Sequence, residues 1–274
     1  TLVNTTGIDL AASVIDGALS VTTTTGSITD SGIITVAKDA RFETLTVNEQ
    51  LALDQLDVAG TIALFTQGIS GDATIVNTTG VDLATSDVGG NIDATATTGG
   101  IIDSGTITVG GTGTFTSPQA GADILLDELN VTGSISLMTS GPAGDATIVN
   151  AIGVDLATSS VAGNLTATAT TGGMTDSGMT LVSGDASFIS LQIGQAIVLD
   201  QLGVDGSISL QTAVDGDATI VNKTAIDLAD STVGGHLSAI ATTGSITDSG
   251  AVTVAKNGRF ETLVANETMT LDQL

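Results

Sequence analysis

Short segments in which apolar residues alternate with small or polar ones run along the whole chain. In one stretch, residues 58–64, 88–97, 106–110 and 129–137 alternate Val, Ile, Leu, Ala or Gly with small or polar residues. Alternation with a period of two, enriched in Val, Ile and Thr, predicts β-strands. No window places apolar residues three and four apart, so the pattern predicts an all-β chain with essentially no helix.

The pattern itself repeats along the chain. Asp-Ser-Gly occurs at residues 30–32, 103–105, 176–178 and 248–250, with spacings of 73, 73 and 72 residues. Val-Asn and Leu-Asp pairs keep the same step. A fixed period of this size indicates a repeat architecture. We predict one continuous solenoid over residues 1–274, made of just under four repeats of about 73 residues. Neither end carries a capping pattern, so we expect a segment of a longer array.

The strand starts set the expected number of coils. They fall at residues 58, 88, 109 and 131, which gives intervals of 30, 21 and 22 residues. Intervals of this size are typical of coils in a parallel β-solenoid, each rising by about 4.8 Å. We therefore predict about three coils per repeat. The longest interval contains residues 71–77, interpreted as an extra short strand or a protruding loop.

One phenylalanine recurs in each repeat. If a repeat makes three whole coils, these rings stack above one another as the widest side chains of the core. The predicted structural residues are Phe42, Phe115, Phe188 and Phe260.

Composition narrows the function classes. The chain has 30 acidic and 5 basic residues and a net charge of −25. This balance argues against nucleic acid and anionic membrane surfaces as partners, because phosphate binding needs Lys and Arg. The same charge fits a soluble extracellular fibre whose copies repel one another sideways. The chain has no Cys, which excludes disulfides and thiolate metal sites. No apolar stretch reaches the length of a membrane span, so we expect no membrane insertion.

The recurring aspartates are the first candidates for chemistry. Carboxylate oxygens are the ligands that calcium prefers, and Asp side chains also bond their own downstream backbone in tight turns. The glycine-rich calcium nonapeptide of β-rolls is absent. We favour the turn role and keep weak calcium binding as the alternative. Otherwise we expect no cofactor. The weak calcium candidates are Asp30, Asp103, Asp176 and Asp248.

An enzyme would require a set of catalytic side chains that occurs once in the chain, not in every repeat. The chain has a single His, His236, which replaces Asn91 and Asn164 of the neighbouring repeats and is interpreted as surface variation. We therefore expect no catalytic residue and no enzymatic activity, including the cleavage of polysaccharides known for some β-helix proteins.

Three further patterns have ordinary explanations. Threonine tracts at 22–25, 95–98 and 168–171 suggest a flat ice-binding face, but an exposed β-wall explains them better. Glycosylation sequons at Asn4, Asn77 and Asn130 are expected by chance in a Thr-rich chain. Four of the five basic residues lie in two similar segments, 35–45 and 253–263, whose charges we interpret as surface variation or as lateral contacts with acidic neighbours.

The run over residues 71–105 carries a family resemblance. Its motifs Gly-Asp-Ala-Thr-Ile-Val-Asn, Gly-Val-Asp-Leu-Ala-Thr-Ser and Ile-Asp-Ser-Gly resemble the repeats of filamentous-haemagglutinin-like bacterial surface proteins. The resemblance covers the whole chain as a style of repeat. It implies a right-handed parallel β-helix, export to the cell surface, and a role as an adhesin stalk or extracellular fibre. Partners would be other copies or surface glycans, bound through regions outside this chain. A self-assembling filament, sheath or matrix protein is the alternative.

Overall fold

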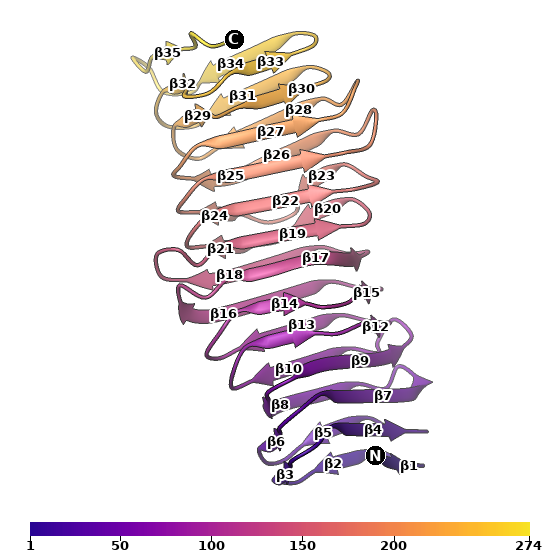
Figure 1. Cartoon of the computed structure of the whole chain (residues 1–274). Helices are drawn as coiled ribbons and strands as arrows, with labels where there is room; N and C mark the ends of the chain where they lie inside the picture. The colour runs from indigo at the N-terminus through magenta and orange to yellow at the C-terminus, as the bar shows by residue number, and fades with distance from the viewer. The chain divides into compact units, whose positions relative to one another are not determined.

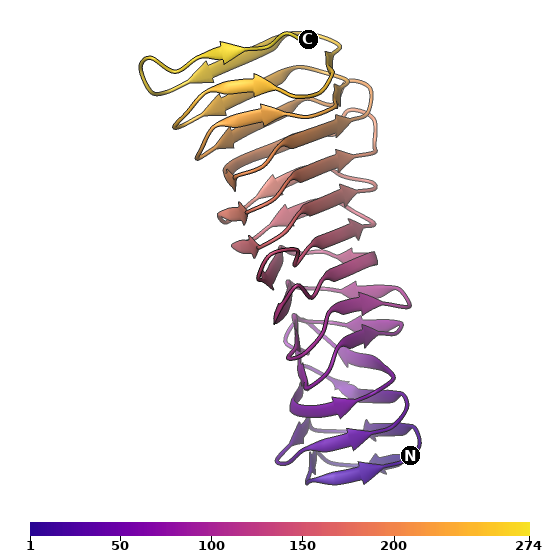
Figure 2. The same cartoon turned by 60° about the vertical axis from the view of Figure 1, so that its left-hand side comes forward.

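The computed structural model describes all residues, 1–274, as an all-β parallel solenoid without helices. The chain makes about 13 turns of about 21 residues each. It forms two compact units, Thr1–Ile135 and Ser136–Leu274. Within each unit, the strands of successive coils lie side by side and parallel, as Figure 1 and Figure 2 show. The prediction of a β-solenoid is confirmed; its right-handed winding stays a prediction.

Unit 1 has two walls of parallel strands, here called wall A and wall B. Wall A consists of β1 (Leu2–Asn4), β4 (Leu19–Thr23), β7 (Ala40–Val47), β9 (Thr61–Gln67), β11 (Val81–Leu83), β12 (Ser86–Val88), β14 (Ile101–Asp103), β15 (Ile107–Val109) and β17 (Ile124–Val131). Wall B consists of β2 (Ile8–Leu10), β3 (Ser13–Ile15), β5 (Ile28–Asp30), β6 (Ile34–Val36), β8 (Leu51–Val58), β10 (Ala73–Asn77), β13 (Ile92–Ala96) and β16 (Gly113–Ala120).

Unit 2 also has two walls of parallel strands, again called wall A and wall B. Its wall A consists of β19 (Ala146–Asn150), β22 (Leu165–Ala169), β25 (Ala186–Ser190), β27 (Ile208–Thr212), β29 (Ile226–Leu228), β30 (Ser231–Val233), β32 (Ile246–Asp248), β33 (Val252–Val254) and β35 (Met269–Thr270). Its wall B consists of β20 (Val154–Leu156), β21 (Ser159–Val161), β23 (Met174–Asp176), β24 (Thr180–Val182), β26 (Ile197–Val204), β28 (Ala218–Asn222), β31 (Leu237–Ala241) and β34 (Gly258–Thr262). β18 (Ile135–Ser140) spans the division and pairs with β21 at Met138 and Ser160.

Each half of a coil consists of one wall strand or of two short consecutive strands, and a repeat contains seven half-coils. In unit 1 these are β1, β2 with β3, β4, β5 with β6, β7, β8 and β9, after which β10 begins the next repeat. The repeat therefore makes three and a half coils, not three. Because seven is odd, β10 lies on wall B although its counterpart β1 lies on wall A. In unit 2, β19 and β28 are divided between the walls in the same way.

The core lies between the two walls and follows from the alternation of the sequence. In β7, Ala40, Phe42 and Thr44 point inward and are buried, whereas Arg41 and Glu43 point outward. Phe42 pairs in register with Val21 of β4 and Leu64 of β9, so the core is a set of aligned columns. A coil too thin to bury its own apolar face buries it against its neighbours.

The phenylalanines do not stack in one line. In unit 1, Phe42 lies on wall A and Phe115 on wall B; in unit 2, Phe188 lies on wall A and Phe260 on wall B. The predicted single column is therefore wrong, because three and a half coils carry each ring to the opposite wall. Phe42, Phe115 and Phe188 are fully buried, and Phe260 is half-buried.

Candidate functional site

The aspartate of each Asp-Ser-Gly motif clamps the backbone of the next coil. In unit 2, the two carboxylate oxygens of Asp176 accept the backbone N–H groups of Asp200 at 2.9 Å and Gln201 at 2.8 Å. In unit 1, Asp30 accepts those of Asp54 and Gln55 at 3.1 and 2.9 Å. Asp103 accepts from Asp127 and Glu128, and Asp248 from Asp272 and Gln273, at 2.9–3.1 Å.

A break in strand pairing creates the need for this clamp. Against the preceding coil, β26 pairs with β23 up to Val198 and with β24 again from Leu202, so Asp200 and Gln201 lack ladder partners on that side. β8 has the same gap against β5 and β6, between Ala52 and Leu56. Unpaired backbone N–H groups are costly when shielded from water, and the carboxylate of the preceding coil satisfies two of them. The predicted turn role is thus corrected: each aspartate bonds 24 and 25 residues onward rather than within its own turn.

Burial shifts the protonation of these aspartates. It raises the pKa of Asp30, Asp103 and Asp176 above the usual 3.8, although the backbone N–H groups that they accept act in the opposite direction. The nearby carboxylates of Asp54, Asp127 and Asp200 raise these pKa values further. The native state therefore holds these protons more tightly than a water-exposed aspartate does.

Because the clamp aspartates already bind backbone N–H groups, few of their oxygen lone pairs remain to coordinate calcium. Each candidate carboxylate already uses both oxygens as backbone acceptors, and the chain has no group of three or more His, Asp or Glu side chains suited to a metal. Calcium prefers six to eight oxygen ligands. A calcium ion at Asp176 would have to share oxygens with the clamp, with Asp200 as the neighbouring carboxylate.

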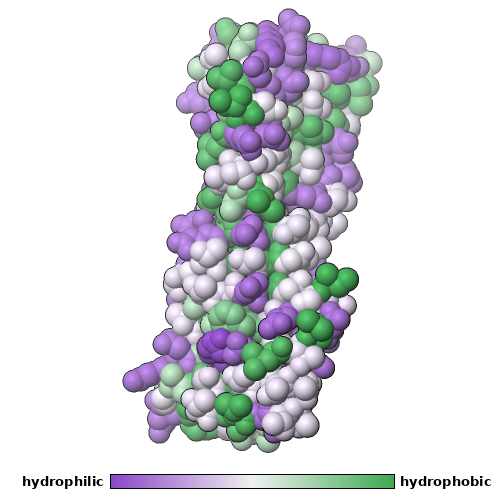
Figure 3. All heavy atoms as spheres, turned by 90° about the vertical axis from the view of Figure 1, so that its right-hand side faces the viewer, coloured by the Kyte–Doolittle hydropathy of each residue, from purple (hydrophilic) through white to green (hydrophobic).

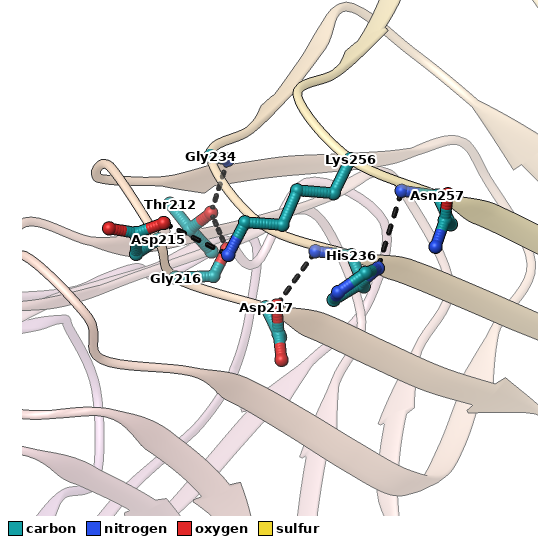
Figure 4. Close-up of polar contacts among 8 residues, drawn as sticks. All are labelled: Thr212, Asp215, Gly216, Asp217, Gly234, His236, Lys256 and Asn257. Carbon is teal, nitrogen blue, oxygen red and sulfur yellow. Dashed lines mark hydrogen bonds and ion pairs between the residues drawn. The ribbon is translucent and has the colours of Figure 1, made fainter.

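A second series of side chains links coils at the corner that leads into wall B. In unit 2, Asp217 Oδ1 accepts the backbone N–H of His236 at 2.7 Å, and His236 Nδ1 accepts the N–H of Asn257 at 3.3 Å (Figure 4). In unit 1, Asp72 and Asn91 fill the same two roles, with both bonds at 2.8 Å. His236 therefore takes over the acceptor role of an asparagine, which the interpretation as surface variation missed.

Glycine is required where the same kind of link occurs at the corner that leads into wall A. Asp39 Oδ1 accepts the N–H of Thr61 at 3.0 Å, and a Cβ on Gly60 would lie 2.6 Å from that oxygen. Any side chain at Gly60 would push the carboxylate off its hydrogen bond. The glycines of the corners thus permit contact between coils as well as tight turns.

The repeated Val-Asn motif places an asparagine inside the corner. Asn77 is fully buried; its Oδ1 accepts the N–H of Val58 at 2.8 Å, and its Nδ2 donates to the carbonyls of Val58 and Gly80 at 3.0 and 2.7 Å. In unit 2, Asn222 repeats these bonds with Val204 and Ala225. The sequon at Asn77 is therefore not an accessible glycosylation site in the folded chain.

The threonine tracts also serve coil stacking. The hydroxyl of Thr98 donates to the carbonyl of Thr78 at 2.6 Å, and in unit 2 Thr171 and Thr243 donate to Ala151 and Lys223 at 2.8 Å each. These bonds run from one corner to the corner of the preceding coil. The end of each tract is thus part of a corner rather than of a flat wall.

Three of the five basic residues form isolated ion pairs at the surface. Arg41 donates to Glu43 at 2.8 Å and lies over the ring of Phe65, 4.3 Å from its centroid. Lys256 reaches Asp215 at 2.9 Å (Figure 4), and Arg259 pairs with Glu261. Surface pairs of this kind contribute little to stability, so they mainly set the charge of the walls.

The geometry defines a class of protein: a parallel β-solenoid repeat protein whose recurring polar residues bind one coil to the next. Residues 1–64, 70–138, 143–213 and 215–274 match the family described as "Repeats of unknown function (DUF5649)", and the chain belongs to this family. No curated protein and no solved structure matches the chain. No helix in the structure has the length and apolarity needed to cross a membrane.

Proposed function

We propose that the chain is a structural repeat segment of a large secreted bacterial surface protein, acting as a rigid adhesin stalk or extracellular fibre. The observation that carries this proposal is the recurrence of the clamp. The same carboxylate binds the same two N–H groups of the next coil at Asp30, Asp103, Asp176 and Asp248. Polar residues that would form a site in an enzyme are used here for stacking, and we propose no enzymatic activity.

The surface location rests on charge and on the resemblance of the repeats to filamentous-haemagglutinin-like proteins. A net charge of −25 keeps exposed copies apart and argues against nucleic acid as a partner. Partners would be surface glycans or other copies, reached in part through regions outside this chain. Calcium that binds weakly at the aspartate clamps would bind a solenoid that is already folded and would not be required for folding.

Labelling of intact source cells tests the location. Antibodies raised against residues 1–274 should decorate the outside of unpermeabilised cells in immunogold electron microscopy. Lysed cells and an antibody against a cytoplasmic protein serve as controls. Labelling that appears only after lysis would refute a surface role.

A self-assembling filament or sheath is the second candidate, favoured by one observation: four neighbouring strands of unit 2 carry no charge. Electron microscopy of native material separates the two functions. Discrete single-chain fibres support the stalk, and ordered arrays of many chains support the filament. A calcium titration followed by thermal melting tests the metal: an unchanged midpoint at millimolar calcium removes it from the proposal.

A further inference from the structure

Wall A of unit 2 carries a continuous outward surface without charge, here called the uncharged face. The strands β19, β22, β25 and β27 contain no Asp, Glu, Lys, Arg or His. By alternation the outward residues of these strands are Thr147, Val149, Thr166, Thr168, Ser187, Ile189, Ser209 and Gln211, of which Thr168 is only 9% exposed. Other strands, such as β16 and β18, also lack charge, but here four such strands are adjacent on one wall.

The side chains of this face lie in two regular columns. Thr147, Thr166, Ser187 and Ser209 pair in register from strand to strand, which gives one column of hydroxyls. The second column is Val149, Thr168, Ile189 and Gln211. The rungs follow the spacing between strands, about 4.8 Å. Small β-branched and hydroxyl side chains at this spacing give a flat surface, which suits packing against another sheet.

Apolar side chains border the face at the corner where β25 and β27 end. Leu191, Ile193 and Val214 are 50%, 70% and 66% exposed. Ile193 and Val214 belong to adjacent coils, since the N–H of Gly194 donates to the carbonyl of Val214 at 2.9 Å. The charge next to Val214 is compensated, because Asp215 is ion-paired with Lys256 (Figure 4). Figure 3 faces these corners and shows apolar atoms exposed among polar ones.

We infer that the uncharged face is the contact surface for a second copy of this chain. Two copies carry −25 each, so every approach that opposes carboxylates is repelled. The uncharged face lets them meet at the lowest electrostatic cost. A two-fold contact opposes the face to itself, and hydroxyls can then pair across it because each is both donor and acceptor. Contact between two copies through the uncharged face is compatible with a stalk as well as with a filament.

The uncharged face is too small for a permanent dimer, so we expect a reversible contact. Four strands at about 4.8 Å and five residues at about 3.3 Å span about 320 Å². A stable interface buries about 800 Å² per partner, so the face and its apolar border fall short of a permanent dimer. We therefore expect a weak contact that forms only at high protein concentration. Salt should strengthen the contact, because it screens the repulsion between the acidic copies.

Cysteine cross-linking of the 274-residue chain tests the inference, since the chain has no cysteine of its own. Ser187→Cys places one thiol at the centre of the face. Thr114→Cys places a matched thiol on β16, an outward position of wall B in unit 1. Under mild oxidation at about 100 µM protein, Ser187→Cys should give at least a ten-fold higher yield of disulfide dimer than Thr114→Cys. Equal yields would overturn the inference.

Sedimentation of cysteine-free protein provides an independent measurement. The average mass of the wild type should rise with concentration, and more steeply in high salt than in low salt. Ile189→Asp should weaken association at least ten-fold, whereas Thr114→Asp adds the same charge elsewhere and should change it less than two-fold. Circular dichroism confirms that both variants are folded. A wild type that stays monomeric at every salt concentration, or binds only a glycan through this face, contradicts the inference while leaving cell-surface labelling unaffected.

Discussion

β7 with β9 in unit 1 and β25 with β27 in unit 2 occupy the same place in the repeat, yet their outward faces differ. Inside, Phe42 and Phe188 are both fully buried. Outside, unit 1 carries Arg41, Glu43 and Phe65, whereas unit 2 carries Ser187, Ile189 and Gln211. Stacking fixes the inward residue of each strand because the next coil must fit it. The outward residue meets only solvent or a partner, so outward residues are where the two units can differ in function.

The sharpest test of this comparison deletes a ring from the core of each unit. Phe42→Ala and Phe188→Ala should each lower the free energy of unfolding by about 3–5 kcal/mol, because each leaves a cavity. Ile189→Ala, one residue away on the outward face, should cost less than about 1 kcal/mol. Urea denaturation measures all three. A Phe188→Ala variant as stable as Ile189→Ala would break the distinction between inside and outside.

The clamps should behave alike in the two units. Asp30→Ala and Asp176→Ala each leave two backbone N–H groups without an acceptor, which should cost about 1–3 kcal/mol of unfolding free energy. Asp200→Ala is the matched control, because its side chain is the neighbour of the clamp and not the acceptor. We expect Asp200→Ala to be neutral or stabilising in urea denaturation. Destabilisation by Asp200→Ala equal to that by Asp176→Ala would contradict the clamp.

Mild acid should stabilise both units. Burial raises the folded-state pKa of Asp30, Asp103 and Asp176 above 3.8. Between pH 3.8 and those raised values the folded state binds more protons than the unfolded state, so the unfolding free energy falls as pH rises through this window. Acidification from pH 7 towards pH 4 should therefore raise the urea midpoint.

The triple variant Asp30→Asn, Asp103→Asn, Asp176→Asn is the control for this pH effect. It removes the three titrating groups, so its urea midpoint should gain less on acidification than that of the wild type. Glu43 acts in the opposite sense at lower pH, because the hydrogen bond from Arg41 lowers its pKa below 4.5. A wild-type midpoint that falls between pH 7 and pH 4.5 would disprove the prediction.

The smallest expected effect concerns a single departure from the repeat. In unit 2, the hydroxyl of Thr175 donates to Asp155 at 3.4 Å across the coils. In unit 1, the corresponding partner of Asp82 is Ile102, and Asp82 Oδ1 has no hydrogen bond. Ile102→Thr should restore the bond and add about 0.5–1 kcal/mol to the free energy of unfolding. Thermal melting measures the gain, and Thr175→Ile should produce the reverse change in unit 2.

The alternation of the sequence was enough to predict parallel strands, the absence of helix and the inward position of each repeated phenylalanine. It did not predict the half-coil. Residues 71–77 predict an extra short strand or a protruding loop, and the structure has the strand, β10; the pattern did not show that β10 lies on the wall opposite β9. Residues 88–97 read as one strand, but the chain turns at Gly89 and Gly90 between β12 and β13. An alternating pattern does not reveal which of two facing walls a strand joins.

The clamps could not be predicted from the sequence for a similar reason. Local rules assign Asp30 to its own turn, while its partners Asp54 and Gln55 come within reach only after the coils are stacked. The role of His236 depends on Asn257 in the same way. The recurrence of Leu-Asp at a constant distance from Asp-Ser-Gly was a signal of this contact, visible before its geometry was known.

The odd number of half-coils has an evolutionary consequence. Duplication of a single repeat within a unit would move every later motif to the opposite wall. A binding patch on such a motif would then lie on the opposite side of the solenoid. Copying a pair restores the original orientation. The exposed Leu45 and Leu191, 146 residues apart, follow this two-repeat step. Where selection acts on surface chemistry, the heritable module is therefore a tandem of two repeats.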